Sequence, residues 1–197
     1  MNLPSRPALQ LLTLRPKAAA AHGFTMIEMA ITLVLVAIMA SIALPGMSEF
    51  VMRSKLSTQV SGMQADIAYA RSEAARRNAV ISLCPASVGT GGASTYSCSG
   101  SNWNIGWITF VDSSGTVGAF DGTDEVLRVH NSTQGISVKG AGGLASATSL
   151  TMRPTGEASV SGSFGFCIPG YPITSLDVKG SGRSSLIYAS AITTTCP

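Results

Sequence analysis

The sequence predicts an α+β fold in which one long N-terminal helix packs on an antiparallel β-sheet domain. Three observations support this prediction. Residues 29–48 form an uncharged, largely apolar segment, and the apolar residues that follow recur at intervals of three and four, as on one face of a helix. Beyond Asn78 apolar and polar residues alternate in short runs, as in β-strands. One long helix followed by strands is typical of the α+β class.

The charges are few and unevenly placed. Of the 197 residues, 45% are apolar and 12% are charged, which excludes a coiled coil, a disordered charged tail and a highly charged nucleic-acid coat. Arg6, Arg15 and Lys17 account for the net charge of +3, because the other 10 basic residues are matched by 10 acidic ones. A basic stretch before an apolar segment targets a chain to the membrane and keeps its own end cytoplasmic. We therefore expect the rest of the chain to lie outside the cytoplasm.

The apolar segment has three interpretations. A helix of about 20 residues is about 30 Å long and can span a bilayer. A secretory signal peptide has a shorter apolar region, although Ser41-Ile42-Ala43 offers a small-x-small cleavage site, and a plain signal anchor is a second alternative. The third interpretation starts from Glu28, because a carboxylate inside an apolar run costs about 2.5 to 3.5 kcal/mol and needs a partner. Cleavage between Gly23 and Phe24 would create an ammonium group that the Glu28 of a neighbouring copy could neutralise.

The N-terminal signature consists of residues 23–28, Gly-Phe-Thr-Met-Ile-Glu, between a basic leader and an apolar helix with Pro45 and Gly46 near its end. This signature resembles the N-termini of type IV prepilins and type II secretion pseudopilins. The resemblance implies that a prepilin peptidase removes residues 1–23, that Phe24 is N-methylated, and that the subunit leaves the inner membrane for a pilus or pseudopilus. Residues 24–49 would be the single membrane-spanning and assembly helix, with the C-terminal domain in the periplasm. We expect Pro45 to kink or locally melt this helix.

Residues 50–78 are predicted to form the amphipathic second half of the helix. The apolar stripe is expected to pack on the sheet, while the polar positions face water. The stripe comprises Leu56, Val60, Met63, Ile67, Ala70 and Ala74, and the polar positions are Lys55, Gln59, Gln64, Asp66, Arg71, Glu73, Arg76 and Arg77.

Residues 79–197 are predicted to form the β-rich domain. Tight turns are expected at Gly115, Gly122, Gly156 and Gly162, whereas the glycine-rich segments 89–92 and 140–143 are expected to be mobile surface loops. The predicted strands are residues 80–83, 103–111, 125–130, 135–138, 149–153, 158–161, 163–168, 173–178 and 185–188.

Further short segments of the mature chain occur in a recognisable order: 72–74 with 77–78, 80–84, 107–110 with Asp112, 121–125, 153–156, 164–167 and 182–183. Together they resemble the FimT and GspH group of minor pilins and pseudopilins. The resemblance implies a pilin-like fold and a FimT-like minor pilin that joins the tip or initiating complex of a type IV pilus and aids its assembly. The alternative is a GspH-type minor pseudopilin of a type II secretion system. Other pilins or pseudopilins are the expected partners in both cases.

The cysteines indicate disulfides. Cys84, Cys98, Cys167 and Cys196 show neither C-x-x-C spacing nor companion histidines, so the sequence does not indicate a zinc site. An exported domain lies in an oxidising compartment, where disulfides form. Of three connectivities we favour Cys84 with Cys98 and Cys167 with Cys196, because each joins sequence neighbours, and reduced thiols are the alternative. Each bond would contribute about 2 to 4 kcal/mol.

The sequence contains no motif that indicates catalysis. Loss of His22 with the leader would leave His130 as the remaining histidine, and its place in a predicted strand beside Arg128 favours a half-exposed structural role. There is no G-x-S-x-G elbow, and residues 89–92 lack the lysine and hydroxyl residue of a phosphate-binding loop. We expect no enzymatic activity, no metal and no cofactor.

A second class of function is the capture of extracellular DNA in natural transformation. Some FimT-like pilins bind DNA through a C-terminal Gly-Arg-x-Arg pattern, whereas residues 182–185 here are Gly-Arg-Ser-Ser, without the second arginine. Lys179 and Arg183 are the candidate contacts with double-stranded DNA, and Lys139 or Arg153 could join them in space. From residue 50 onward 10 basic residues face 8 acidic ones, while nucleic-acid binding takes several phosphate contacts. The sequence therefore supports a filament subunit more strongly than DNA capture.

Overall fold

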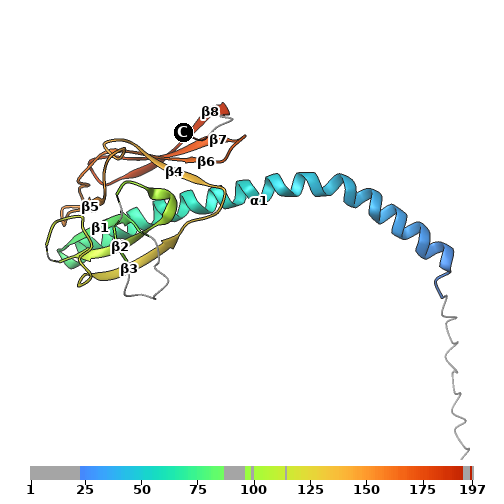
Figure 1. The fold of residues 1–197 in the computed structure, drawn as a ribbon, viewed down its shortest axis with the longest axis horizontal. Helices are drawn as coiled ribbons and strands as arrows, with labels where there is room; N and C mark the ends of the chain where they lie inside the picture. The colour runs from blue at the N-terminus through green and yellow to red at the C-terminus, as the bar shows by residue number, and fades with distance from the viewer. Residues whose placement is uncertain (1–22, 87–95, 99, 114, 193–195, 197) are drawn as a thin grey trace, which may run out of the picture. The chain divides into compact units, whose positions relative to one another are not determined.

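The computed structural model describes residues 23–86, 96–98, 100–113, 115–192 and 196 (Figure 1). Most of the predicted leader and the glycine-rich segment 89–92 lie outside the described residues. The chain divides into two compact units, Met1–Pro45 and Gly46–Pro197, and each is described by itself.

The long helix α1 (Met26–Arg77) begins with a local cap. The Thr25 hydroxyl accepts a hydrogen bond of 3.2 Å from the backbone N–H of Glu28, and the Glu28 carboxylate in the first turn has the favourable sign for the helix dipole. The sequence predicted a kink or local melting at Pro45; the helical backbone continues through Pro45 and Gly46, so the helix is not melted there, and the kink stays a prediction. A proline removes one hydrogen bond of the helix and leaves the bonds on either side in place.

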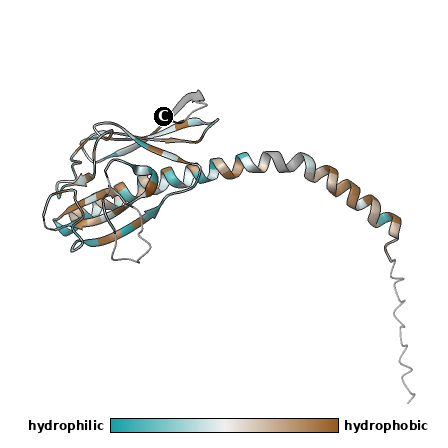
Figure 2. Cartoon of the chain, viewed as in Figure 1, coloured by the Kyte–Doolittle hydropathy of each residue, from teal (hydrophilic) through white to brown (hydrophobic). Residues whose placement is uncertain are grey.

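The first part of α1 consists mostly of apolar residues, coloured brown in Figure 2. Phe24 is 74% exposed and Met26 is 94% exposed, and further large apolar side chains are exposed as far as Met39. Within the described residues, no helix is both long and apolar enough to cross a membrane.

Two four-stranded antiparallel sheets follow α1, where the sequence predicted strands of a single sheet. The first has the strand order β3-β2-β1-β5, and the second has the order β4-β6-β7-β8. A 3-10 helix, η1 (Trp103–Ile105), precedes β2. The strands are β1 (Val80–Pro85), β2 (Gly106–Asp112), β3 (Glu125–Asn131), β4 (Ser137–Gly142), β5 (Leu150–Met152), β6 (Gly162–Cys167), β7 (Pro172–Val178) and β8 (Ser184–Ile192).

The hydrophobic core joins the second half of α1 to both sheets. All six residues of the predicted apolar stripe are buried, and Met63 and Ile67 are fully inaccessible. They belong to one cluster that includes Leu83 of β1 and Phe164 of β6. The ring of Trp103 meets Phe164 edge to face at 4.8 Å between centroids, which connects η1 to the second sheet. The predicted fold class, a long helix on antiparallel β-structure, is confirmed.

Three predicted segments differ in the structure. Residues 158–161 are not a strand, because only Ala158 forms an isolated bridge, with Met152. Residues 103–105 are helical, and the strand begins at Gly106, whose φ of 103° interrupts an extended chain. The segment 140–143 is not a free loop, because Gly140 and Gly142 belong to β4. A Cβ at Gly140 would overlap the backbone of the fully buried Leu144, so the glycine permits close packing there.

Candidate functional site

A line of polar side chains on α1 is buried, contrary to the sequence prediction. Gln59, Asp66 and Glu73 are 4%, 5% and 8% exposed, although all three were expected to face water. They are seven residues apart, so they lie on one side of the helix. We call this line and its partners on β2, on β3 and at the end of α1 the α1–β3 seam. Its Gln59 end is held by the hydroxyl of Thr133, which accepts a hydrogen bond from the Gln59 amide.

Asp66 is the centre of the seam. Its Oδ2 accepts a hydrogen bond of 2.8 Å from Trp107 Nε1, and its Oδ1 lies 3.1 Å from a terminal nitrogen of Arg128. His130 Nδ1 lies 3.6 Å from Oδ2, and the His130 ring stacks on Trp107 at 4.1 Å. Burial alone would raise the pKa of Asp66, but hydrogen bonding by His130, Trp107 and Arg128 outweighs it and lowers the pKa below its ordinary value. This arrangement fixes β2 and β3 to the helix.

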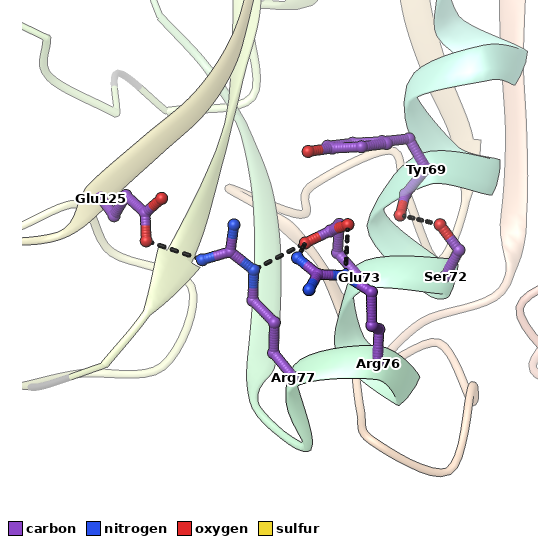
Figure 3. Close-up of polar contacts among 6 residues, drawn as sticks. All are labelled: Tyr69, Ser72, Glu73, Arg76, Arg77 and Glu125. Atoms are coloured by element: carbon purple, nitrogen blue, oxygen red, sulfur yellow. Dashed lines mark hydrogen bonds and ion pairs between the residues drawn. The ribbon is translucent and has the colours of Figure 1, made fainter.

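Glu73 holds the C-terminal end of the seam (Figure 3). Its carboxylate accepts hydrogen bonds from Arg76 at 2.6 Å and from Arg77 at 2.6 Å, and Arg77 also bonds Glu125 of β3 at 2.7 Å. The bonds from Arg76 and then Arg77 lower the pKa of Glu73 to about 2. Every side chain of this cluster is engaged with another, which is a structural arrangement.

The predicted N-terminal site is a short, exposed segment. Gly23, Phe24 and Thr25 precede α1, and Glu28 lies exposed in its first turn. The backbone N–H of Glu28 donates a hydrogen bond to the Thr25 hydroxyl. Glu28 is the acidic residue of the first turn of α1. Pro45 lies inside the helix, at the boundary between the two compact units.

Both cysteine pairs are joined as the sequence favoured. Cys84 of β1 forms a disulfide with Cys98, and Cys167 of β6 forms one with Cys196. The Cys98 sulfur also accepts a hydrogen bond of 3.3 Å from the backbone of Phe120. The first bond therefore ties the chain before β2 to the first sheet, and the second ties the C-terminal end of the chain to the second sheet.

The candidate DNA contacts flank one tight turn between β7 and β8. The Gly182 N–H donates to the Lys179 carbonyl at 2.8 Å, and the Lys179 N–H donates to the Arg183 carbonyl at 2.9 Å. The turn that begins at Arg153 packs beside this one, because the Ala158 N–H donates to the Gly180 carbonyl at 2.9 Å. Of the two further cations considered from the sequence, Arg153 therefore begins the turn that packs against that of Lys179 and Arg183. Lys139 lies on β4, away from both turns.

A groove of about 510 Å³ lies between α1 and these two turns. Sequence reasoning missed its helical cation, Arg71, which was counted among the solvated polar positions. The signal available in the sequence was weak, since a single arginine on the polar face of an amphipathic helix is usually a solvated charge. We call this cavity the Arg71 groove; its lining residues are Gln64, Ala68, Arg71, Ser72, Ala75, Thr155, Gly156, Gly182, Arg183 and Ser184.

None of the described residues forms a group of three or more metal-ligating side chains. His130 is engaged by Asp66 and Trp107 in the seam. The cations that the two turns and the Arg71 groove present are Lys179, Arg183, Arg153 and Arg71.

Comparison with known proteins identifies two matching regions. Residues 59–186 match the family model described as type II transport protein GspH, and residues 19–44 match the prokaryotic N-terminal methylation motif. No curated protein matches the sequence.

Among solved structures, the crystal structure of the type IV minor pilin FimU from Pseudomonas aeruginosa PAO1 in space group P21 is similar. The TM-score is 0.53 at 20% identity, over 75% of this chain and 99% of that chain. The same protein in space group P65 gives a TM-score of 0.49 at 21% identity, over 72% of this chain and 99% of that one. The first likeness supports the pilin-like fold described above.

Proposed function

The chain belongs to the GspH family of type II transport proteins, the family of minor pilins and pseudopilins, and on that premise we propose that it is a FimT-like minor pilin of a type IV pilus. It would assemble with other pilins through the first part of α1. A GspH-type pseudopilin of a type II secretion system is the alternative.

The observation that carries this proposal is the exposed apolar surface of residues 24–41. Large side chains such as Phe24, Ile27 and Leu33 are each more than 60% exposed in the single chain. Burying one such side chain fully contributes about 1.5 to 3 kcal/mol, so this surface strongly favours lipid or apolar partners over water. We propose that it lies first in the inner membrane and then among the helices of neighbouring subunits.

Processing would prepare the helix for assembly. The match of residues 19–44 to the methylation motif supports cleavage by a prepilin peptidase after Gly23 and N-methylation of Phe24. The new ammonium group of one subunit would pair with the Glu28 carboxylate of its neighbour. In an apolar filament core an unpaired carboxylate is costly, so Glu28 makes only one register of neighbouring helices favourable.

Fractionation of sheared filaments tests this role. In the native bacterium, with the gene deleted and restored on a plasmid, the mature full chain should be recovered with the filaments. Glu28→Gln should remain in the membrane, because its neighbour's ammonium group would lack a partner, whereas Glu49→Gln, outside the apolar segment, should assemble. Absence of the wild-type chain from filaments, or normal assembly of Glu28→Gln, would contradict the proposal. A tip position predicts a few copies per filament, found at one end by gold labelling.

DNA capture is the second candidate function. The turn at Lys179 and Arg183 presents two cations, with the Arg153 turn beside it, and this is the local feature that supports it. A titration of the full chain in detergent with duplex DNA at low salt tests it. Arg183→Ala should weaken binding and lower the steepness of its salt dependence by about one charge. No binding by the wild-type chain, or equal binding by Arg183→Ala, would remove this candidate.

A further inference from the structure

Arg71 differs from the other arginines of α1. Arg53, Arg76 and Arg77 each lie within 3 Å of a carboxylate oxygen. Among the described residues Arg71 has no carboxylate within ion-pair distance, and its Nε donates a hydrogen bond of 3.1 Å to the Gly156 carbonyl. That bond holds the guanidinium in place, and the terminal nitrogens make no hydrogen bond with any residue that the structure describes.

The backbone builds the groove around this guanidinium. Gly156 and Gly182 have φ of 81° and 71°, a conformation that glycine adopts readily. A Cβ at Gly182 would overlap the Gly156 carbonyl, so the two turns touch through their backbones. As a result Arg183 from the turn and Arg71 from the helix line one cavity, although they are far apart in sequence.

The lining of the Arg71 groove is selective for anions. It combines two guanidinium groups with the hydroxyl of Ser184, and no aspartate or glutamate is among its described lining residues. The hydroxyls of Ser72 and Thr155 also line it, but they already donate hydrogen bonds, to the Tyr69 carbonyl and to Glu157. Two acidic residues are adjacent in sequence to lining residues, and both are already engaged: Glu73 accepts hydrogen bonds from Arg76 and Arg77, and Glu157 accepts one of 3.3 Å from Thr155. Guanidinium forks bind carboxylates and phosphates with paired hydrogen bonds, so an oxyanion is the complementary ligand.

An oxyanion in this groove could be a carboxylate of another protein or a phosphate of duplex DNA. The number of cations decides between these two ligands. A protein that binds duplex DNA through its backbone commonly makes about 6 to 10 phosphate contacts. The groove supplies two arginines, and the chain from residue 50 onward has only two more basic than acidic residues. One fixed arginine fork beside a second arginine matches a single carboxylate better than a repeating phosphate backbone.

We propose that the Arg71 groove binds an aspartate or glutamate side chain of a neighbouring filament subunit. This inference rests on the filament role proposed above and names the chemistry of one contact between globular domains. The carboxylate would take the terminal nitrogens of Arg71 and would be closed in by Arg183. Since Arg71 is only partly accessible, this ion pair would be screened less than an exposed surface pair.

Filament incorporation of single-charge variants tests the groove. The full chain is expressed in the deletion strain as Arg71→Gln, Arg183→Gln and Lys179→Gln, and its ratio between sheared filaments and membranes is measured. Arg71→Gln and Arg183→Gln should each lower the ratio about tenfold, the loss of one charge-assisted interaction. Lys179→Gln is the matched control, because it removes the same charge from the same turn but does not line the groove. Its ratio should equal that of the wild-type chain.

The outcomes separate the possible failures. Equal ratios for all variants, or the same loss in Lys179→Gln, would overturn the proposal, and a wild-type chain absent from filaments would overturn the filament role itself. Arg71→Gln also loses the bond to Gly156, so the thermal unfolding of the variants in detergent is compared. The Arg183 side chain makes no hydrogen bond within the described part of the chain, so Arg183→Gln keeps the test valid. Normal incorporation with a loss of duplex DNA retention in both groove variants would assign the groove to nucleic acid instead. Arg71→Glu should not assemble, because it places a carboxylate opposite the partner's carboxylate. Changing that acidic residue of the partner subunit to lysine should restore assembly.

Discussion

Gly62 lies in the middle of α1, and its substitution by alanine should reveal how tightly the α1–β3 seam is packed. A Cβ at Gly62 would overlap the His130 ring, with Nε2 at 3.0 Å and Nδ1 at 3.1 Å. Ordinarily Gly→Ala in a helix stabilises by about 0.5 to 1 kcal/mol. Here the ring would have to leave its stack on Trp107 and its contact with Asp66. These contribute about 0.5 to 1.5 kcal/mol each, so Gly62→Ala should destabilise by about 0.5 to 2 kcal/mol.

The companion variant reverses the sign. In a His130→Ala background the space above Gly62 is empty, so adding Gly62→Ala should stabilise by about 0.5 to 1 kcal/mol. Urea unfolding of the full chain in detergent, followed by tryptophan fluorescence, measures the wild-type chain and the three variants, since Trp107 stacks on the His130 ring. If Gly62→Ala stabilised the chain equally in both backgrounds, His130 would not be seated over the helix and the described seam would be wrong.

Three further predictions concern pH, cross-links and a turn. Glu73 has a pKa lowered to about 2, so the stability it contributes is complete above pH 4.5 and is lost as the pH falls towards 2. In Glu73→Gln the free energy of unfolding should therefore depend less on pH between 4.5 and 2 than in the wild-type chain. Replacing Cys98 or Cys196 by serine should lower the free energy of unfolding by about 2 to 4 kcal/mol in each case, as measured by thermal unfolding without reductant. The loss should be slightly larger for Cys196, because its disulfide closes a loop of 29 residues rather than 14. Gly182→Ala should destabilise by more than 1 kcal/mol in the same assay, because it combines a positive φ with overlap of Gly156.

The sequence predicted what depends on local periodicity. The apolar stripe from Leu56 to Ala74 follows from helical spacing alone, and all six residues are buried. The switch to strands after Asn78 is equally local, because Asn78 adopts φ 52° directly after the end of α1, two residues before β1. The cysteine pairing was accessible because each partner is near in sequence.

The errors arose where distant segments decide. From the sequence alone, Asp66 is expected to be a solvated helix residue. Its burial is possible because Trp107, Arg128 and His130, more than 40 residues later in the chain, contact its carboxylate. Only the seven-residue spacing of Gln59, Asp66 and Glu73 signalled a second buried line. The glycines of 140–143 read as a loop, although they allow β4 to pack against Leu144.

The Arg71 groove was missed for a related reason. Arg71 and Arg183 come from opposite ends of the folded unit, and only the contact between the turns of Gly156 and Gly182 brings them to one cavity. Counting charges along the sequence detected the basic turn but not the helical arginine beside it.

Mass spectrometry of the chain purified from sheared native filaments tests directly whether the chain is a processed filament subunit. We expect an intact mature protein that begins at Phe24, carries one added methyl group on its amine, and retains both disulfides. A chain that begins at Leu44 would place the cleavage after Ser41-Ile42-Ala43 and would contradict the assembly helix altogether. A chain that keeps residues 1–23 would contradict the processing and the pairing proposed for Glu28.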